Sequence, residues 1–173
     1  MSTGSERVPP TPQALEEALE VSLDLISDIE LERTSLTAAA LKASRLARLL
    51  NDFESQEMFK YEAGGYPSSP DGIPPNIWQL AVAAGRVSEQ KNQETGDVDL
   101  RAFVESIDVL IEQIAVAKMA LGVAGDRDVS LTSANPYQQV QAPIGNVFER
   151  QRLQTQINTA SGKLASRRSL IFD

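Results

Sequence analysis

The middle of the sequence holds its most regular apolar pattern, which limits the possible folds more than any other feature. Between residues 99 and 121 apolar side chains recur every three or four positions, with none missing: Leu100, Phe103, Ile107, Leu110, Ile114, Ala117 and Leu121. A helix has this period. Asp99 suits the N-cap and Gly122 suits the end. We therefore expect a helix over about 99–121.

Three helices are predicted upstream of this one. The first spans about 12–31, with Thr11 as its N-cap. The second begins near Ser35 and is rich in alanine, which would let a neighbouring helix approach closely. The third spans about 52–63 and ends at Gly64–Gly65, since glycine is the usual residue just beyond a helix C-terminus.

Two more helices and one ambiguous stretch complete the pattern. Asn76 is a candidate N-cap for a short helix, and Asn146 with Glu149 resembles a capping box at the start of the last helix. Residues 86–98 are open to two interpretations. They could continue the short helix, or they could form a hairpin that turns at 94–97.

The expected fold is an all-α bundle of about five helices, with the long helix at about 99–121 in its centre. We prefer this to an intermolecular coiled coil, which usually sustains more heptads. Two long irregular loops, 64–76 and 123–145, carry prolines. Residues 1–11 are expected to be a disordered lead-in, and 12–173 a single helical domain. The last helix stops in mid-pattern, which suggests a longer protein or an end that docks.

The composition removes most catalytic chemistry. The chain has no Cys and no His, which excludes thiolate nucleophiles, imidazole bases and the common zinc sites. No phosphate-binding glycine motif is present. Two acidic rows have helical spacing that could suit a metal, but solvated helix faces explain them better: Glu105, Asp108 and Glu112, and Asp24, Asp28 and Glu32. We expect no enzyme activity, no metal and no cofactor.

Charge and hydropathy bear on partners and location. The net charge is −8, which disfavours nucleic acid as a partner, although residues 126–173 carry more basic than acidic residues. Arg167 and Arg168 could clamp a phosphate or carboxylate, or could simply oppose the negative end of the helix dipole. No apolar run is long enough for a membrane span, and the start of the chain is not a signal peptide, so a cytoplasmic protein is expected.

The most distinctive local cluster follows the third helix. Tyr61 and Tyr66 flank Glu62 and a Gly-Gly pair, just before Pro67. They could form a recognition edge or a hydrophobic clasp over the helix end, and we favour the clasp. Our candidate interaction residues are the aromatic and basic positions Tyr61, Tyr66, Trp78, Tyr137, Arg150, Arg167 and Arg168.

Two segments together resemble a known family. The helix from Ser35 to Asp52, with its Leu41-Lys42-Ala43 step, and the ending Glu62-Ala63-Gly64-Gly65-Tyr66 resemble the AbiTii domain over about 14–86. This bacterial helical domain takes its name from abortive-infection phage-resistance systems. Its usual ending, Glu-Leu-Asn-Gly-Tyr, is changed here, since Ala63 and Gly64 replace Leu and Asn. The resemblance implies a defence-associated accessory or sensor module and supplies no catalytic residue.

The function that these observations favour is a non-enzymatic protein-interaction or oligomerisation module of antiphage defence. Its partner would be a second copy or another defence component, not a membrane. The working surface would be the Gly64–Asn76 excursion, the 123–145 loop or the C-terminal helix. Two alternatives stay open. One is a catalytic toxin or effector domain that uses carboxylates and arginine. The other is a nucleic-acid-binding accessory subunit that uses the basic C-terminal helix.

Overall fold

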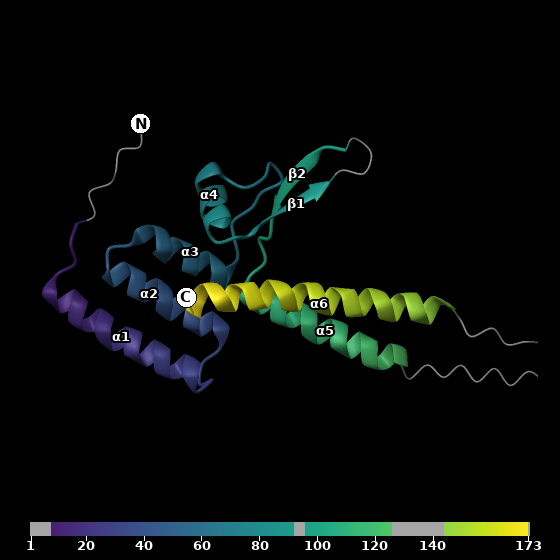
Figure 1. Cartoon of the computed structure of the whole chain (residues 1–173), viewed down its shortest axis with the longest axis horizontal. Coiled ribbons are helices and arrows are strands. Elements are labelled where there is room, and N and C mark those ends of the chain that lie inside the picture. The colour runs from purple at the N-terminus through teal and green to yellow at the C-terminus, as the bar shows by residue number, and fades with distance from the viewer. Residues whose placement is uncertain (1–7, 92–95, 126–143, 173) are drawn as a thin grey trace, which may run out of the picture. The chain divides into compact units, whose positions relative to one another are not determined.

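A computed structural model describes residues 8–91, 96–125 and 144–172 (Figure 1). These residues are mostly helical, which confirms the all-α prediction in its coarse form, and they also contain one two-stranded sheet. The chain divides into two compact units. Unit 1 is Met1–Asp108 with Arg167–Asp173, and unit 2 is Val109–Ser166. The expected single domain over 12–173 stays a prediction.

Unit 1 begins with two helices whose starts follow from local capping. Helix α1 spans Pro12–Glu30 and α2 spans Leu36–Leu49. Thr11 and Ser35 are the N-caps, and each accepts a hydrogen bond from a backbone N–H three residues on. Helix α2 contacts both α1 and α3. Its buried side chains are all alanines, so neighbouring helices can approach closely: Ala39, Ala40, Ala43 and Ala47.

The end of α3 explains the Gly-Gly pair. Helix α3 spans Phe53–Gly64, with Asp52 as its N-cap, close to the prediction. Gly65 follows with a φ of 91°. A Cβ at this position would lie 3.0 Å from the backbone oxygen of Val104. The next residue, Tyr66, donates its backbone N–H to that same oxygen at 2.9 Å. Glycine is therefore required here both by the backbone angle and by the close approach of a second segment.

Helix α4 and a hairpin follow. Helix α4 spans Pro75–Ala83, and its N-cap is Pro74, so the predicted cap at Asn76 is wrong. Two consecutive prolines set the entry instead, since proline suits the first helical position. Strands β1 (Val87–Lys91) and β2 (Val98–Ala102) pair antiparallel. Of the two interpretations of 86–98, the hairpin is therefore correct.

The hairpin also corrects the predicted central helix. Leu100 lies in β2 opposite Glu89, and α5 begins only at Ile107. Asp99 is a strand residue rather than an N-cap. Leu100 and Phe103 fit the helical period only by coincidence, since Leu100 lies in β2 and Phe103 directly follows that strand. Pairing with β1, which periodicity cannot detect, decides the structure of 98–102.

An apolar cluster of unit 1 gathers around α4. Tyr66 packs with residues of this helix and of the turn after it, namely Ile77, Leu80, Ala81 and Ala84. Partly buried side chains from α3, the segment after β2 and the last turn of α6 surround them, including Met58, Tyr61, Val104 and Leu170. The cluster thus brings together segments that are far apart in the sequence.

Unit 2 consists, in its described part, of two helices that run in opposite directions (Figure 1). Helix α5 spans Ile107–Gly125 and α6 spans Ile144–Phe172, with the ends nearest Asp108 and Arg167 belonging to unit 1. Gly122 lies inside α5 and Asn146 inside α6, so the predicted end and the predicted cap are both wrong. Most of the predicted 123–145 loop lies outside the described residues. None of the described helices has the length and apolarity of a membrane span.

Candidate functional site

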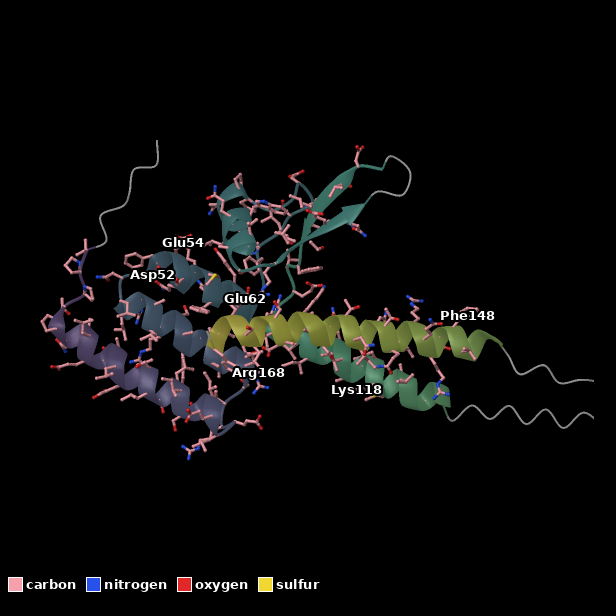
Figure 2. The ribbon with its side chains drawn as sticks, viewed as in Figure 1. Asp52, Glu54, Glu62, Lys118, Phe148 and Arg168 are labelled. Atoms are coloured by element: carbon pink, nitrogen blue, oxygen red, sulfur yellow. The ribbon has the colours of Figure 1, made fainter. Side chains whose placement is uncertain are left out.

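Unit 1 contains a buried carboxylate. Glu62, which Figure 2 labels, lies on the last turns of α3. Its side chain is fully buried. Its Oε1 accepts a hydrogen bond from the Tyr66 hydroxyl at 2.6 Å and another from Nε of Arg86 at 2.8 Å. Arg86, just after α4, is only 3% exposed. A buried charge needs a counter-charge and hydrogen bonds, and Glu62 has both.

A second arginine reaches the same carboxylate from the last turns of α6. Nε of Arg167 lies 3.2 Å from Oε2 of Glu62, and the Arg167 side chain is 1% exposed. The two atoms are within ion-pair distance but are not aligned for a hydrogen bond. This contact explains why a basic residue interrupts the apolar stripe of the last helix. We call Glu62, Tyr66, Arg86 and Arg167 the Glu62 cluster.

The electrostatics of the Glu62 cluster follow from its burial. Loss of water lowers the pKa of Arg167, while the charges of Glu62 and Glu105 act in the opposite direction. Burial is also the main cause that raises the pKa of Tyr66, and the hydrogen bond to Glu62 adds to it. Tyr66 is thus held as a neutral hydrogen-bond donor. With two arginines and a phenol facing it, Glu62 is suited to holding α3, the turn after α4 and the end of α6 together.

Unit 2 contains a groove between its two helices. Its volume is about 610 Å³. Small side chains form its floor, where Ala117 and Ala160 are buried. Both helices contribute to the walls, α5 through Val109, Glu112, Gln113, Val116, Ala117 and Ala120, and α6 through Leu153, Thr155, Gln156, Thr159, Ala160 and Lys163. We call this the α5–α6 groove.

Large apolar side chains are exposed on α5 and α6. Val116, on the groove wall, is 59% exposed, and Met119, outside the groove, is 74% exposed. Val147 and Phe148 are also largely exposed. Both lie near the start of α6, where Figure 2 labels Phe148. Among the described residues of unit 2, the buried apolar side chains are few: Leu110, Ala117, Ile157 and Ala160. Helices α5 and α6 thus leave much of their apolar surface exposed to water.

The candidate aromatic residues have different surroundings. The rings of Tyr61 and Tyr66 lie 5.5 Å apart and tilted by 41°, and both belong to the apolar cluster around α4. This arrangement favours the clasp over the recognition edge. Trp78, on α4, is half-buried. Tyr137 lies outside the described residues.

The candidate arginines also separate. Arg150 is exposed on α6. Arg168 is exposed as well, with its guanidinium 3.7 Å from Glu32 and 5.1 Å from the centre of the Phe172 ring. Arg167 is buried on Glu62. Adjacent in sequence, Arg167 and Arg168 therefore have different partners, and they do not clamp one anion together in this structure.

The two acidic rows are not continuous helix faces. Glu105 precedes the first residue of α5, and Glu32 follows the end of α1 with a φ of 51°. Asp108 accepts a hydrogen bond from Thr37 at 2.5 Å, and Asp24 and Asp28 both hold Lys42. Within the described ranges, no group of acidic side chains is placed to hold a metal ion.

Sequence reasoning missed the Glu62 cluster and the α5–α6 groove. Glu62 did stand inside the Tyr-Glu-x-Gly-Gly-Tyr segment, so its local signal was visible. Arg86 had no signal, and Arg167 appeared only as an interruption in an apolar stripe. The groove had a partial signal, because Val116 extends the apolar face of α5 beyond its buried stripe.

Comparison with known protein families gives a match. The model of the AbiTii family matches residues 20–173. The match therefore includes α5 and α6, which lie downstream of the segments that resemble the family. No curated protein and no solved structure matches the chain. Since the match covers nearly the whole sequence, the chain belongs to the AbiTii family, whose name associates it with abortive-infection defence.

Proposed function

We propose that the chain is a cytoplasmic, non-enzymatic interaction module of antiphage defence that self-associates through the α5–α6 groove. The observation that carries this proposal is the groove itself, which lies between two helices, has both apolar and polar residues along its walls, and includes the exposed Val116. Exposed apolar side chains that gather on one part of a protein surface support an interaction site there.

Because the described part of unit 2 has only two helices, further helices are favoured as the occupant of the α5–α6 groove. Two antiparallel helices cannot enclose a core by themselves, and the common solution is a bundle of four. The alanines on the groove floor allow a further helix to approach closely. Every copy of the chain can supply two such helices, namely its own α5 and α6.

The charges on the groove walls favour a second copy over an unrelated helix. Glu112 lies near the start of α5 and Lys163 near the end of α6, and both line the groove. Because the helices run in opposite directions, the two residues are at the same end. In a dimer with its two-fold axis parallel to the helices, α5 of each copy lies beside α6 of the other. Glu112 then faces Lys163 of the second copy, so the surface is self-complementary.

The alternatives, a catalytic effector and a nucleic-acid-binding subunit, stay predictions. The buried position of Arg167 weakens the second, since a nucleic-acid surface on α6 would have to rely on exposed residues such as Arg150 and Arg152. It also weakens a catalytic use of Arg167, because its guanidinium already faces Glu62.

Light scattering on matched variants tests the proposal. Val116 lines the groove and Met119, three residues away, does not, although both are exposed on α5. Val116→Glu places a charge in the groove of each copy and should yield a monomer. Met119→Glu makes the same chemical change outside the groove and should leave the dimer intact. Both variants should keep the helical circular dichroism of the original chain.

Two results would count against the proposal. One is an original chain that stays monomeric at concentrations of about 100 μM, where even a dimer with a dissociation constant of about 10 μM would be mostly formed. The other is a well-folded Val116→Glu variant that is as dimeric as Met119→Glu. Either result would mean that the groove does not mediate self-association.

A further inference from the structure

A second exposed apolar surface lies on α1, in unit 1. Leu15, Leu19, Leu23 and Ile26 are between 48% and 61% exposed. Their spacing places them on one side of the helix. We call them the α1 stripe. It differs from the face that α1 buries, which includes Ala18 and Leu25. The helix thus has one apolar face that is covered and a neighbouring one that is not.

Acidic residues accompany the α1 stripe. Glu16 and Glu20 are exposed, and each lies three residues before a leucine of the stripe, so they are its neighbours on the helix surface. Helix α1 contains no basic residue. Cations do reach it from α2, but they pair elsewhere: Lys42 contacts Asp24 and Asp28, and Arg45 contacts Glu17 at 2.6 Å. None of the described ion pairs involves Glu16 or Glu20.

This charge pattern selects the occupant. A second copy docked antiparallel would place two Glu16–Glu20 rows along the same side of the interface, where they would repel. A parallel copy would place that row beside α2 of the other copy. The cations there, Lys42 and Arg45, already pair with acidic residues of their own α1. An anionic membrane surface would be repelled too. A protein that binds the α1 stripe should therefore supply apolar anchors at helical spacing and cations beside them.

We infer that the α1 stripe binds a basic amphipathic helix of another protein, with leucine-like anchors on Leu19 and Leu23 and lysine or arginine beside Glu16 and Glu20. This surface is distinct from the α5–α6 groove and does not depend on self-association. A chain with both surfaces could join copies of itself through one and a different protein through the other.

The test uses synthetic peptides and fluorescence anisotropy. The probe is a labelled peptide of Leu, Ala and Lys, about 18 residues or five helical turns long, with leucines on one stripe and lysines along its flank. The first control peptide has the same composition in scrambled order. The second replaces every lysine by glutamate. The chain should bind the probe about tenfold more tightly than either control.

Variants of the chain locate the binding. Leu19→Ser with Leu23→Ser should weaken binding of the probe by about tenfold or more. Leu41→Ser is the matched control, since Leu41 is 52% exposed on α2 outside the stripe, and it should leave binding unchanged. Glu16→Lys with Glu20→Lys should reverse the preference, so that the glutamate peptide binds better than the probe.

Three results would overturn the inference: equal binding of the probe and the scrambled peptide, full binding by the folded Leu19→Ser, Leu23→Ser variant, or an unchanged preference after charge reversal. The same stripe variants should remain dimers in light scattering. Loss of peptide binding with the dimer retained therefore concerns the α1 stripe alone. Failure of the dimer in the Val116→Glu experiment concerns the groove alone.

Discussion

The Glu62 cluster and the α5–α6 groove reverse the usual distribution of charged and apolar groups in different ways. Unit 1 buries charged side chains of opposite sign together, so that Glu62 faces two arginines and a tyrosine. Unit 2 leaves large apolar side chains such as Val116 in water. A buried charge and an exposed apolar surface are both informative, because neither is the default in a folded protein.

The difference assigns separate roles to the two regions. The Glu62 cluster uses its charges internally, so it should govern stability and have little direct effect on association. The groove contributes little to the stability of the single chain, so it should govern association. Substitutions in one region should therefore change one property and spare the other.

Glu62→Gln should have the largest effect on stability. It removes a negative charge from between Arg86 and Arg167, and breaking a buried ion pair in this way lowers the free energy of unfolding by about 3–5 kcal/mol. Glu57→Gln, on the exposed side of the same helix, should change it by less than about 0.5 kcal/mol. Urea unfolding measures the free energy of unfolding of both variants. Similar values would contradict a stabilising role of Glu62.

Tyr66→Phe should have an intermediate effect. It deletes the hydroxyl that donates to Glu62 at 2.6 Å and leaves the ring in the apolar cluster. A hydrogen bond to a charged group contributes about 1.5–3 kcal/mol, so a loss in this range is expected in the same unfolding experiment. Tyr61→Phe is the control, since Tyr61 packs beside Tyr66 but does not reach Glu62, and its effect should be small.

Alkaline pH should weaken unit 1 through Tyr66. Its pKa is raised in the folded state, so the proton is held more tightly there than in the unfolded chain. The resulting stabilisation is fully present below the unfolded value of about 10 and is lost as the pH rises above it. The pKa of Lys42 is also raised, by Asp24 and Asp28, and it acts in the same direction. The melting temperature of Tyr66→Phe should therefore fall less steeply above about pH 10 than that of the original chain.

Unit 2 should show the smallest effect on stability. Val116→Glu and Met119→Glu replace side chains that are already more than half exposed, so each should change the stability of the isolated chain by about 0.5 kcal/mol or less. Thermal unfolding of dilute protein, below the dissociation constant of the dimer, measures this. A large loss in the Val116→Glu variant would mean that the groove is part of the internal core.

The parts of the fold that were predictable depend on local rules. Thr11, Ser35 and Asp52 begin helices because their side chains accept hydrogen bonds from the next turn, and that signal lies within four residues. The start of α5 was misplaced because residues 98–102 obey a non-local rule. Their pairing with 87–91 outweighs an apolar spacing that also fits a helix.

The sites were harder to predict for the same reason. Glu62 and Arg167 lie in different halves of the sequence, and only the packing of α3 beside the last turn of α6 joins them. Nothing around Arg86 indicates that it reaches the same carboxylate. The α5–α6 groove requires two helices to be paired, and the apolar pattern of each one alone does not show which of its faces remains open.

Self-association through the groove is the central claim, and a distance measurement between two copies tests it directly. The chain has no cysteine, so Met119→Cys provides a single site for a nitroxide spin label outside the groove. Double electron–electron resonance should detect a defined distance between two labels in this protein. The same label combined with Val116→Glu should show none. A labelled chain without dipolar coupling, or coupling that persists after Val116→Glu, would contradict the account.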